Sequence, residues 1–257
     1  MSIYTDQLNR IIKLPQIPKR IISLVPSQTE LLHYLGLEEE VIGITKFCVH
    51  PESWFRAKNR IGGTKQYDFN KIEALKPDLI IGNKEENDQT QINQLASKYP
   101  VWMSDVLTLE DSFDMILKIG DLVDRSEKAQ ELVTDLRNAF AKLEIRRTQK
   151  AAYFIWRKPY MIAANDTFIN EMMRIAGFEN VFANKKRYPE ITLTELSETQ
   201  PEIILLSSEP YPFQEKHFEE FKKACPNATI LLIDGELFSW YGNRLLKSAA
   251  HFLVQKY

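Results

Sequence analysis

Short apolar runs rich in β-branched residues alternate with segments of helical spacing along the whole chain. Residues 20–25 form such a run, and Pro26 and Ser27 end it. Leucines at helical spacing follow as far as Gly36, a residue type favoured just after a helix. Ser27 and Glu30 have the spacing of a capping box at the start of this helix. Strand and helix in this order predict an α/β fold with a mostly parallel sheet.

The second half of the chain repeats the order of the first. Residues 72–81 and 196–205 each read as a short helix, a proline, an acidic residue and a buried strand. Residues 101–122 and 229–254 each read as a strand, a loop and an amphipathic helix. Repetition at this scale predicts two Rossmann-like α/β lobes, an N-terminal lobe over residues 1–124 and a C-terminal lobe over residues 149–257.

Residues 125–148 join the two halves and are expected to form a linking helix. From Ser126 to Arg147 there is neither glycine nor proline, and apolar residues follow helical spacing from Ala129 to Leu143. Roughly 22 helical residues would span about 33 Å. The pattern therefore predicts two lobes joined by a single long, stiff helix, with limited motion between them.

Composition excludes several classes of protein. The 257 residues carry a net charge of −2, without the basic excess typical of nucleic-acid binders. Cys48 and Cys225 cannot form a disulfide framework or a four-cysteine zinc site. No apolar run approaches the ~18–20 residues needed to cross a bilayer. Residues 1–19 have no recognisable export signal, so the chain as written is expected to be cytoplasmic or already processed.

The loops that follow the predicted strands carry the candidate ligand contacts, because ligands of parallel sheets bind beyond the carboxyl ends of the strands. These loops are rich in aromatic residues, which suit a large flat or apolar ligand, although they could also simply close the ends of the lobes. The planar donor fork of Arg157 suits an acidic group or an amide, although Arg157 could also lie in a solvated turn. We expect a ligand in a cleft between the lobes, contacted by Ser27, Gln28, Phe47, Thr64, Asn83, Trp156, Arg157, Tyr160, Tyr188, Glu236 and Trp240.

Signatures of catalysis are absent from the sequence. It contains no nucleophile elbow, zincin motif or dinucleotide-binding fingerprint, and residues 62–65 lack the upstream glycine of a phosphate loop. Cys48 and His50 could ligate a metal, but too few further ligands gather around them in the sequence. Cys48 is more simply a small buried hydrophobe. We expect no catalytic residues, no metal ligands and no intrinsic cofactor.

The chain resembles the substrate-binding proteins of ABC importers for cobalamin, ferric siderophores and haem, the class with a helical backbone between its lobes, and is most similar to its cobalamin-binding members. The matching stretches are residues 20–30, 35–36, 41–43, 74–81, 177, 179–182 and 201–204, so the similarity covers nearly the whole chain from Asp6. It implies the two-lobed fold, a metal chelate as ligand and an ABC permease as partner.

Two departures from the family pattern concern function. Members carry one surface glutamate per lobe that docks the permease, and those positions fall here on Asn70 and Thr194, with Glu73 and Glu195 close by. Tryptophans that line the cobalamin site of relatives fall on Thr64, Asn83 and Tyr188, while Phe47 keeps an aromatic place. The resemblance therefore implies a different pocket, in which cobalamin is one candidate among several.

These observations predict a monomeric ligand-binding protein and not an enzyme. A corrinoid, haem or ferric siderophore would lie against Phe47, Trp156, Tyr160, Tyr188 and Trp240, with Arg157 pairing an acidic group. Two alternatives stay open. One is an enzyme of similar shape, such as a tetrapyrrole metal chelatase, for which only His50 is placed to act. The other is a cytoplasmic carrier or sensor that keeps the scaffold and meets no permease.

Overall fold

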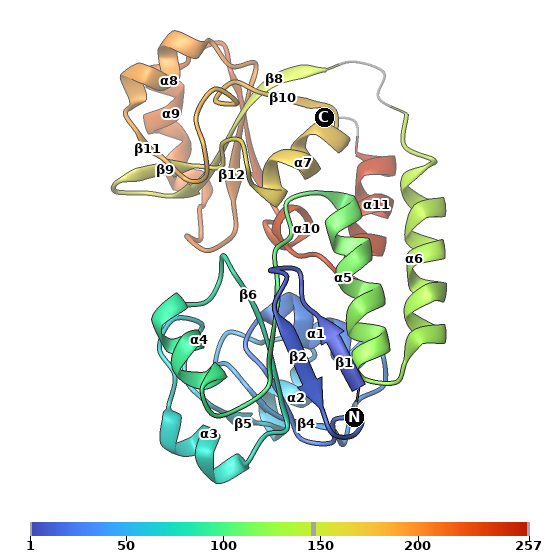
Figure 1. The fold of residues 1–257 in the computed structure, drawn as a ribbon. Coiled ribbons are helices and arrows are strands. Elements are labelled where there is room, and N and C mark those ends of the chain that lie inside the picture. The colour runs from blue at the N-terminus through green and yellow to red at the C-terminus, as the bar shows by residue number, and fades with distance from the viewer. Residues whose placement is uncertain (1, 145–147, 256–257) are drawn as a thin grey trace. The chain divides into compact units, whose positions relative to one another are not determined.

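The computed structural model describes residues 2–144 and 148–255 and divides into two compact units, each with its own sheet (Figure 1). Apart from the six residues outside that description, unit 1 comprises Met1–Val106, Glu110–Asn138 and Tyr241–Leu246. Unit 2 comprises Leu107–Leu109, Ala139–Trp240 and Lys247–Tyr257. The predicted α/β class with mostly parallel sheets is confirmed in both units.

Unit 1 contains a five-stranded parallel sheet in the order β5-β4-β3-β6-β7. Its strands are β3 (Ile21–Ser23), β4 (Val41–Ile44), β5 (Asn59–Arg60), β6 (Leu79–Asn83) and β7 (Val101–Ser104). The helices between and after them are α1 (Pro26–Tyr34), α2 (Glu52–Ala57), α3 (Phe69–Leu75), α4 (Gln89–Ala96), α5 (Leu109–Leu122) and α6 (Ser126–Phe140). Every residue of β3, β6 and β7 is buried, as expected for strands covered by helices on both faces.

Unit 2 contains a mixed sheet in the order β11-β9-β8-β12-β13, in which β10 also pairs with β8. Its strands are β8 (Gln149–Trp156), β9 (Tyr160–Ile162), β10 (Phe178–Asn180), β11 (Glu190–Ile191), β12 (Ile203–Ser207) and β13 (Thr229–Ile233). Its helices are α7 (Phe168–Ile175), α8 (Leu193–Thr199), the 3-10 helix η1 (Glu215–His217), α9 (Phe218–Ala224), α10 (Glu236–Ser239) and most of α11 (Leu245–Val254).

The predicted internal repeat is present in the strand order. The parallel run β4-β3-β6-β7 of unit 1 recurs as β10-β8-β12-β13 in unit 2. Helices α3 and α8 occupy equivalent places, each beginning at a side-chain cap, Asp68 or Thr192. Each helix then ends on a left-handed residue, Lys76 at φ 46° and Gln200 at φ 47°.

The acidic residue after each proline of the repeat explains why this motif recurs. The carboxylate of Asp78 accepts hydrogen bonds from the backbone N–H groups of Lys19 and Arg20, both at 2.8 Å. The carboxylate of Glu202 accepts one from the backbone N–H of Lys150 at 2.9 Å. Each acidic side chain thus joins the start of its own strand to the backbone that enters the neighbouring strand, which sets the register of the central pair.

The expected capping box of α1 is wrong. Helix α1 begins with Pro26, whose missing N–H needs no cap, and its N-cap residue Val25 offers no side-chain hydrogen bond. The Glu30 side chain instead pairs with Arg244, whose Nε and Nη2 donate to the two carboxylate oxygens at 2.7 and 2.9 Å. Both side chains are almost fully buried, so this pair fixes the segment Tyr241–Leu246 to α1 within unit 1.

Two expected segments differ in the structure. Helix α6 ends at Phe140, earlier than the expected Arg147, because Leu136 is its last buried residue and the apolar positions beyond it are only partly packed. Arg146 and Arg147 lie outside the described residues. Tyr160, expected in a loop after a strand, begins β9, because the chain reverses at Lys158 and pairs back onto β8. The domain boundaries 1–124, 125–148 and 149–257 stay a prediction.

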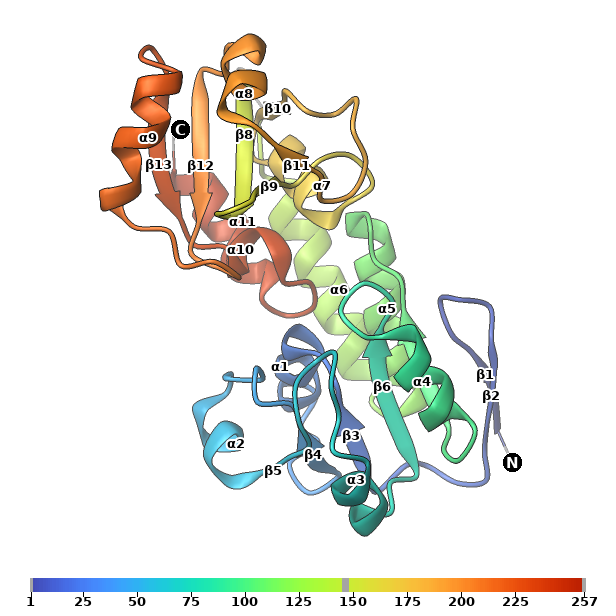
Figure 2. The ribbon, with the colours of Figure 1, turned by 90° about the vertical axis from the view of Figure 1, so that its left-hand side faces the viewer.

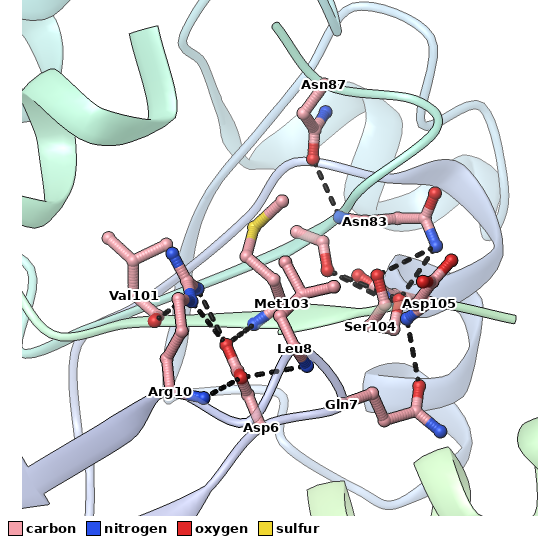
Figure 3. A network of polar contacts seen from close by, with 12 residues as sticks. Asp6, Gln7, Leu8, Arg10, Asn83, Asn87, Val101, Met103, Ser104 and Asp105 are labelled. Carbon is pink, nitrogen blue, oxygen red and sulfur yellow. Dashed lines mark hydrogen bonds and ion pairs between the residues drawn. The ribbon is translucent and has the colours of Figure 1, made fainter. Parts of the chain in front are cut away.

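A hairpin of β1 (Ser2–Thr5) and β2 (Ile11–Leu14), which the sequence analysis missed, precedes the sheet of unit 1 (Figure 2). Its turn covers β7, the edge strand of that sheet. The buried Asp6 carboxylate accepts from the backbone N–H of Met103, and Gln7 bonds Met103 and Asp105 (Figure 3). Because an exposed edge strand pairs readily with other chains, this turn protects unit 1 against edge-to-edge association.

Helices α5 and α6 run side by side in unit 1, as both ribbon views show. Gly120 of α5 lies against the Cβ of Ala129, so that no side chain fits between the helices at this point. Arg137 and Glu110 form an exposed two-pronged ion pair at 2.8 and 2.6 Å farther along the same contact. Within the described segments no helix is long and apolar enough to cross a membrane.

Candidate functional site

A pocket of about 720 Å³ lies at the carboxyl ends of β4 and β5 in unit 1. It brings together two of the predicted ligand residues, Phe47 and Thr64. The Phe47 side chain is half exposed, at 50%, although it is large and apolar. The pocket is lined by Lys46, Phe47, Gly62, Gly63, Thr64, Lys65, Gln66, Tyr67 and Asp68.

The loop that forms one wall of this pocket is held in place by hydrogen bonds. Gly62 adopts φ +115°, and a Cβ there would clash with the carbonyl of Gln66, so the position requires glycine. The carbonyl of Thr64 accepts from the Tyr67 hydroxyl at 2.7 Å and from Asn87 Nδ2 at 3.0 Å. Burial raises the pKa of Tyr67, which keeps its hydroxyl protonated as a donor. The wall is therefore formed by bonds within the protein before any ligand binds.

Three other predicted residues of unit 1 lie below the surface at the strand ends. Gln28 Nε2 donates to Ser104 Oγ at 2.6 Å, and Asn83 Nδ2 donates to the same oxygen at 2.9 Å. Ser27 is buried beside Tyr241, whose pKa is raised by burial. All three side chains are buried. They join the ends of α1, β6 and β7, and the structure does not bring them to the pocket wall.

The aromatic residues predicted in the first loop of unit 2 have different environments. Trp156 ends β8 with 38% of its surface exposed, and its ring meets Tyr211 edge to face with centroids 5.8 Å apart. Tyr160 is half-buried and packs edge to face against Phe154 and Phe221. Trp156 therefore leaves more of its ring accessible to a ligand than Tyr160 does.

The donor fork of Arg157 is already occupied within unit 2. Its Nε and Nη2 donate to the two carboxylate oxygens of Glu220 at 2.8 and 2.9 Å. These hydrogen bonds raise the pKa of Arg157. At Glu220 partial burial favours the neutral acid, but the bonds from Arg157 and Tyr160 outweigh it and lower the pKa. Glu220 therefore takes the place that was expected for an acidic group of the ligand.

Two of the remaining predicted residues of unit 2, Glu236 and Trp240, lie at the ends of α10, and Tyr188 precedes β11. Trp240 is only 7% exposed, and its Nε1 donates to Glu209 Oε1 at 2.9 Å. Burial raises the pKa of Glu209, and Ser239 shares the same carboxylate oxygen. Glu236 begins α10 and is half-buried. Tyr188 is half-buried, with the Arg187 guanidinium 6.0 Å from its ring centroid.

The candidate docking residues occupy the two equivalent helices of the repeat. Asn70 and Glu73 are exposed on α3, and Glu73 lies 3.9 Å from the ammonium of Lys98. Thr194 is exposed on α8, whereas Glu195 closes the capping box of that helix and pairs with Lys185 at 3.1 Å. Those bonds, the one to the backbone of Thr192 first, lower the pKa of Glu195. Their role in docking stays a prediction.

The residues that the structure describes offer no site for metal ligation by protein side chains. Cys48 is fully buried beside the hydroxyls of Thr29 and Thr45, and burial raises the pKa of its thiol. It is the small buried residue expected from the sequence. His50 is half-buried. Over residues 2–144 and 148–255 no three His, Cys, Asp or Glu side chains gather in a way that could hold a metal ion.

Seven of the nine lining residues were not among the predicted contacts, and the two lysines among them are Lys46 and Lys65. Both are exposed, and each directly adjoins a residue that was predicted, Phe47 or Thr64. The signal that could have found them is their position in the loops after β4 and β5, because the same rule that selected their neighbours applies to them.

Comparison with known proteins assigns the chain to a family. The periplasmic binding protein family matches residues 21–226, most of the chain. The vitamin B12-binding protein of Photorhabdus laumondii is 27% identical over 244 residues, which cover 93% of this chain and 88% of that protein.

Solved structures show the same fold. A periplasmic heme binding protein from Pseudomonas aeruginosa matches with a TM-score of 0.79 at 20% identity, covering 92% of this chain and 91% of that one. A protein of the ABC-type Fe³⁺-hydroxamate transport system from Saccharomonospora viridis matches with a TM-score of 0.75 at 19% identity, covering 98% and 97%. The family and these proteins are named for binding or transport, as expected for a protein that is not an enzyme. The chain belongs to the periplasmic binding protein family.

Proposed function

We propose that this protein is the substrate-binding component of an ABC import system for a metal chelate, which is a corrinoid, haem or a ferric siderophore. The observation that carries the proposal is the pocket of unit 1, whose half-exposed Phe47 lies at the carboxyl ends of parallel strands. The names of the related proteins support this choice of ligand class, since they bind vitamin B12 or heme or belong to Fe³⁺-hydroxamate transport.

The ligand contacts follow from exposure. From unit 1 we propose Phe47 and Thr64, and from unit 2 Trp156 with the accessible sides of Tyr160 and Tyr188. Exposed aromatic faces suit the flat, largely apolar surface of a tetrapyrrole or corrin. Glu236 is proposed as a polar contact beside them.

The buried candidates take supporting roles in this proposal. Gln28 and Asn83 hold the ends of β6 and β7 together through Ser104, and Ser27 is buried next to Gln28 in α1. Trp240 anchors α10 to Glu209. Arg157 fixes the loop after β8 through Glu220, and would contact an acidic group of the ligand only by giving up that pair.

Isothermal titration with cobalamin, cobinamide, haem and ferric siderophores tests the proposal. Replacing Phe47 or Trp156 by alanine should weaken binding of the recognised chelate by about fivefold to thirtyfold, the scale of a lost aromatic contact of 1–2 kcal/mol. Leu253→Ala is the matched control, because Leu253 is an exposed apolar residue at the end of α11. Unchanged affinity in both aromatic variants would remove these residues from the site.

Docking to the permease is proposed to use α3 and α8 through Glu73 and Glu195. The equivalent places of these helices in the repeat support the proposal. Glu73→Lys with Glu195→Lys should abolish stimulation of transport in vesicles that contain the permease, while ligand affinity stays unchanged. Full stimulation by this variant would remove Glu73 and Glu195 from the docking surface, whereas no stimulation by the wild type would favour the alternative of a carrier or sensor that meets no permease.

A further inference from the structure

We infer that the pocket beside Phe47 binds an acidic group carried on a flat apolar ligand, and that Lys46 and Lys65 select for this negative charge. The inference deepens the proposed function by naming the chemical class of its ligand. It rests on the lining of one pocket that lies wholly within unit 1.

The two lysines stand beside the one large apolar surface of the pocket. The ammonium of Lys46 lies 5.1 Å from the centroid of the Phe47 ring, and Lys65 adjoins Thr64 on the opposing loop. Gly63 packs closely against this ring, because a Cβ there would lie 3.3 Å from it. A ligand beside Phe47 would therefore lie close to the Lys46 ammonium, in a pocket that Lys65 also lines.

Neither lysine is neutralised by the protein in the part of the chain that the structure describes. Neither Lys46 nor Lys65 has a carboxylate within ion-pair distance there, whereas six other lysines of unit 1 do, namely Lys19, Lys58, Lys71, Lys84, Lys98 and Lys118. The acidic residue of the lining, Asp68, caps α3 and lies 3.6 Å from the ammonium of Lys71. The pocket thus presents positive charge to an incoming ligand.

The fixed shape of the pocket explains why this charge would favour ligands with an acidic group over neutral ligands of the same form. The wall of the pocket is fixed by the bonds of Thr64 and by the glycine conformation at Gly62. A ligand in this pocket therefore enters a space that both lysines line and whose backbone is already held in place. A carboxylate or phosphate on its edge gains two charge-assisted hydrogen bonds, which an ester or amide at the same place cannot match.

The first test uses two probes that share an aromatic body and differ in charge. 8-Anilinonaphthalene-1-sulfonate carries a sulfonate, and N-phenyl-1-naphthylamine does not. In fluorescence titrations Lys46→Gln with Lys65→Gln should weaken sulfonate binding by about tenfold and binding of the neutral amine by less than about twofold. Lys13→Gln with Lys76→Gln is the matched control, since both are exposed unit 1 lysines outside the pocket and Gln200 occupies the place equivalent to Lys76.

A second pair, haem and haem dimethyl ester, carries the test to a chelate. The pocket variant should lose affinity for the acid and keep it for the ester. Equal loss for charged and neutral probes, no loss for either, equal loss in the control variant, or no saturable binding of the sulfonate to the wild type would each overturn the inference. If the protein bound the sulfonate through the two lysines but bound none of the chelates, the proposed function would be refuted and the inference would still hold.

Discussion

Removing Arg244 should destabilise unit 1 far more than removing an exposed arginine with the same kind of pair. The side chains of Arg244 and Glu30 are only 6% and 11% exposed. Arg244→Met leaves the Glu30 carboxylate buried without its bidentate partner, and such a loss costs about 3–5 kcal/mol. Replacing both residues by methionine removes the buried charges together, so the double variant should be more stable than Arg244→Met alone.

Urea unfolding measured by tryptophan fluorescence tests this prediction. All variants carry Trp156→Phe and Trp240→Phe, so that the buried Trp54 and Trp102 report on unit 1 alone. Arg137→Met is the control, because Arg137 forms an equally bidentate pair with Glu110 at the surface. It should leave the midpoint unchanged. If Arg244→Met shifted the midpoint no further than Arg137→Met, burial would not be what makes the Glu30 pair matter.

Three further changes test other parts of the account. Asp6→Ala should lower the free energy of unfolding by roughly 2–4 kcal/mol, the scale of one or two hydrogen bonds to a charged group. It should also increase aggregation, measured by light scattering, because it uncovers β7. Full stability and no aggregation would contradict this prediction. Gly62→Ala should lower the free energy of unfolding by about 1–3 kcal/mol, because the position has a positive φ, and should weaken chelate binding. The same change at the less restricted Gly63 should have a smaller effect. Thermal unfolding and ligand titration measure the two effects. Glu209 has a raised folded pKa, so its contribution to stability is full below its usual pKa and is lost as the pH rises through the folded value. Glu209→Gln should therefore lose less stability than the wild type between about pH 4 and pH 7 in urea titrations, and an identical loss would contradict the assignment.

The repeated fold could be predicted because its signals are local. A proline after a short helix, an acidic residue and a run of apolar residues recur in both halves, and each has a local physical role. The carboxylates of Asp78 and Glu202 then carry out that role across the sheet. The family resemblance depends on the same local stretches, which is why the comparisons confirm it.

Partners that are distant in sequence could not be predicted. Glu30 matches the capping-box spacing, but Arg244, 214 positions away, takes its carboxylate. Arg157 was expected to pair with an acidic group of the ligand. In the structure it pairs with Glu220, which is 63 positions away in the sequence. In both cases a local pattern was outweighed by a charge that only the folded chain brings close.

Burial separates the predicted residues that can contact a ligand from those that cannot. The rule that ligands bind beyond strand ends selected Phe47 and Thr64, which line one pocket, together with Gln28 and Asn83, which are buried and do not line it. The rule gives position along a strand but not the direction of a side chain. Lys46 and Lys65 satisfy the same rule, since they adjoin the selected residues and share their pocket, but they were not chosen as contacts.

The central proposal is that the protein binds a metal chelate and that the exposed aromatic residues Phe47 and Trp156 contact it. Isothermal titration of the wild type and of the Phe47→Ala, Trp156→Ala and Leu253→Ala variants against cobalamin, cobinamide, haem and a set of ferric siderophores tests it most directly. The account predicts saturable binding of one chelate class, weakened by the two aromatic changes and unaffected by Leu253→Ala. Absence of binding across the set, or binding that neither aromatic change weakens, would contradict it.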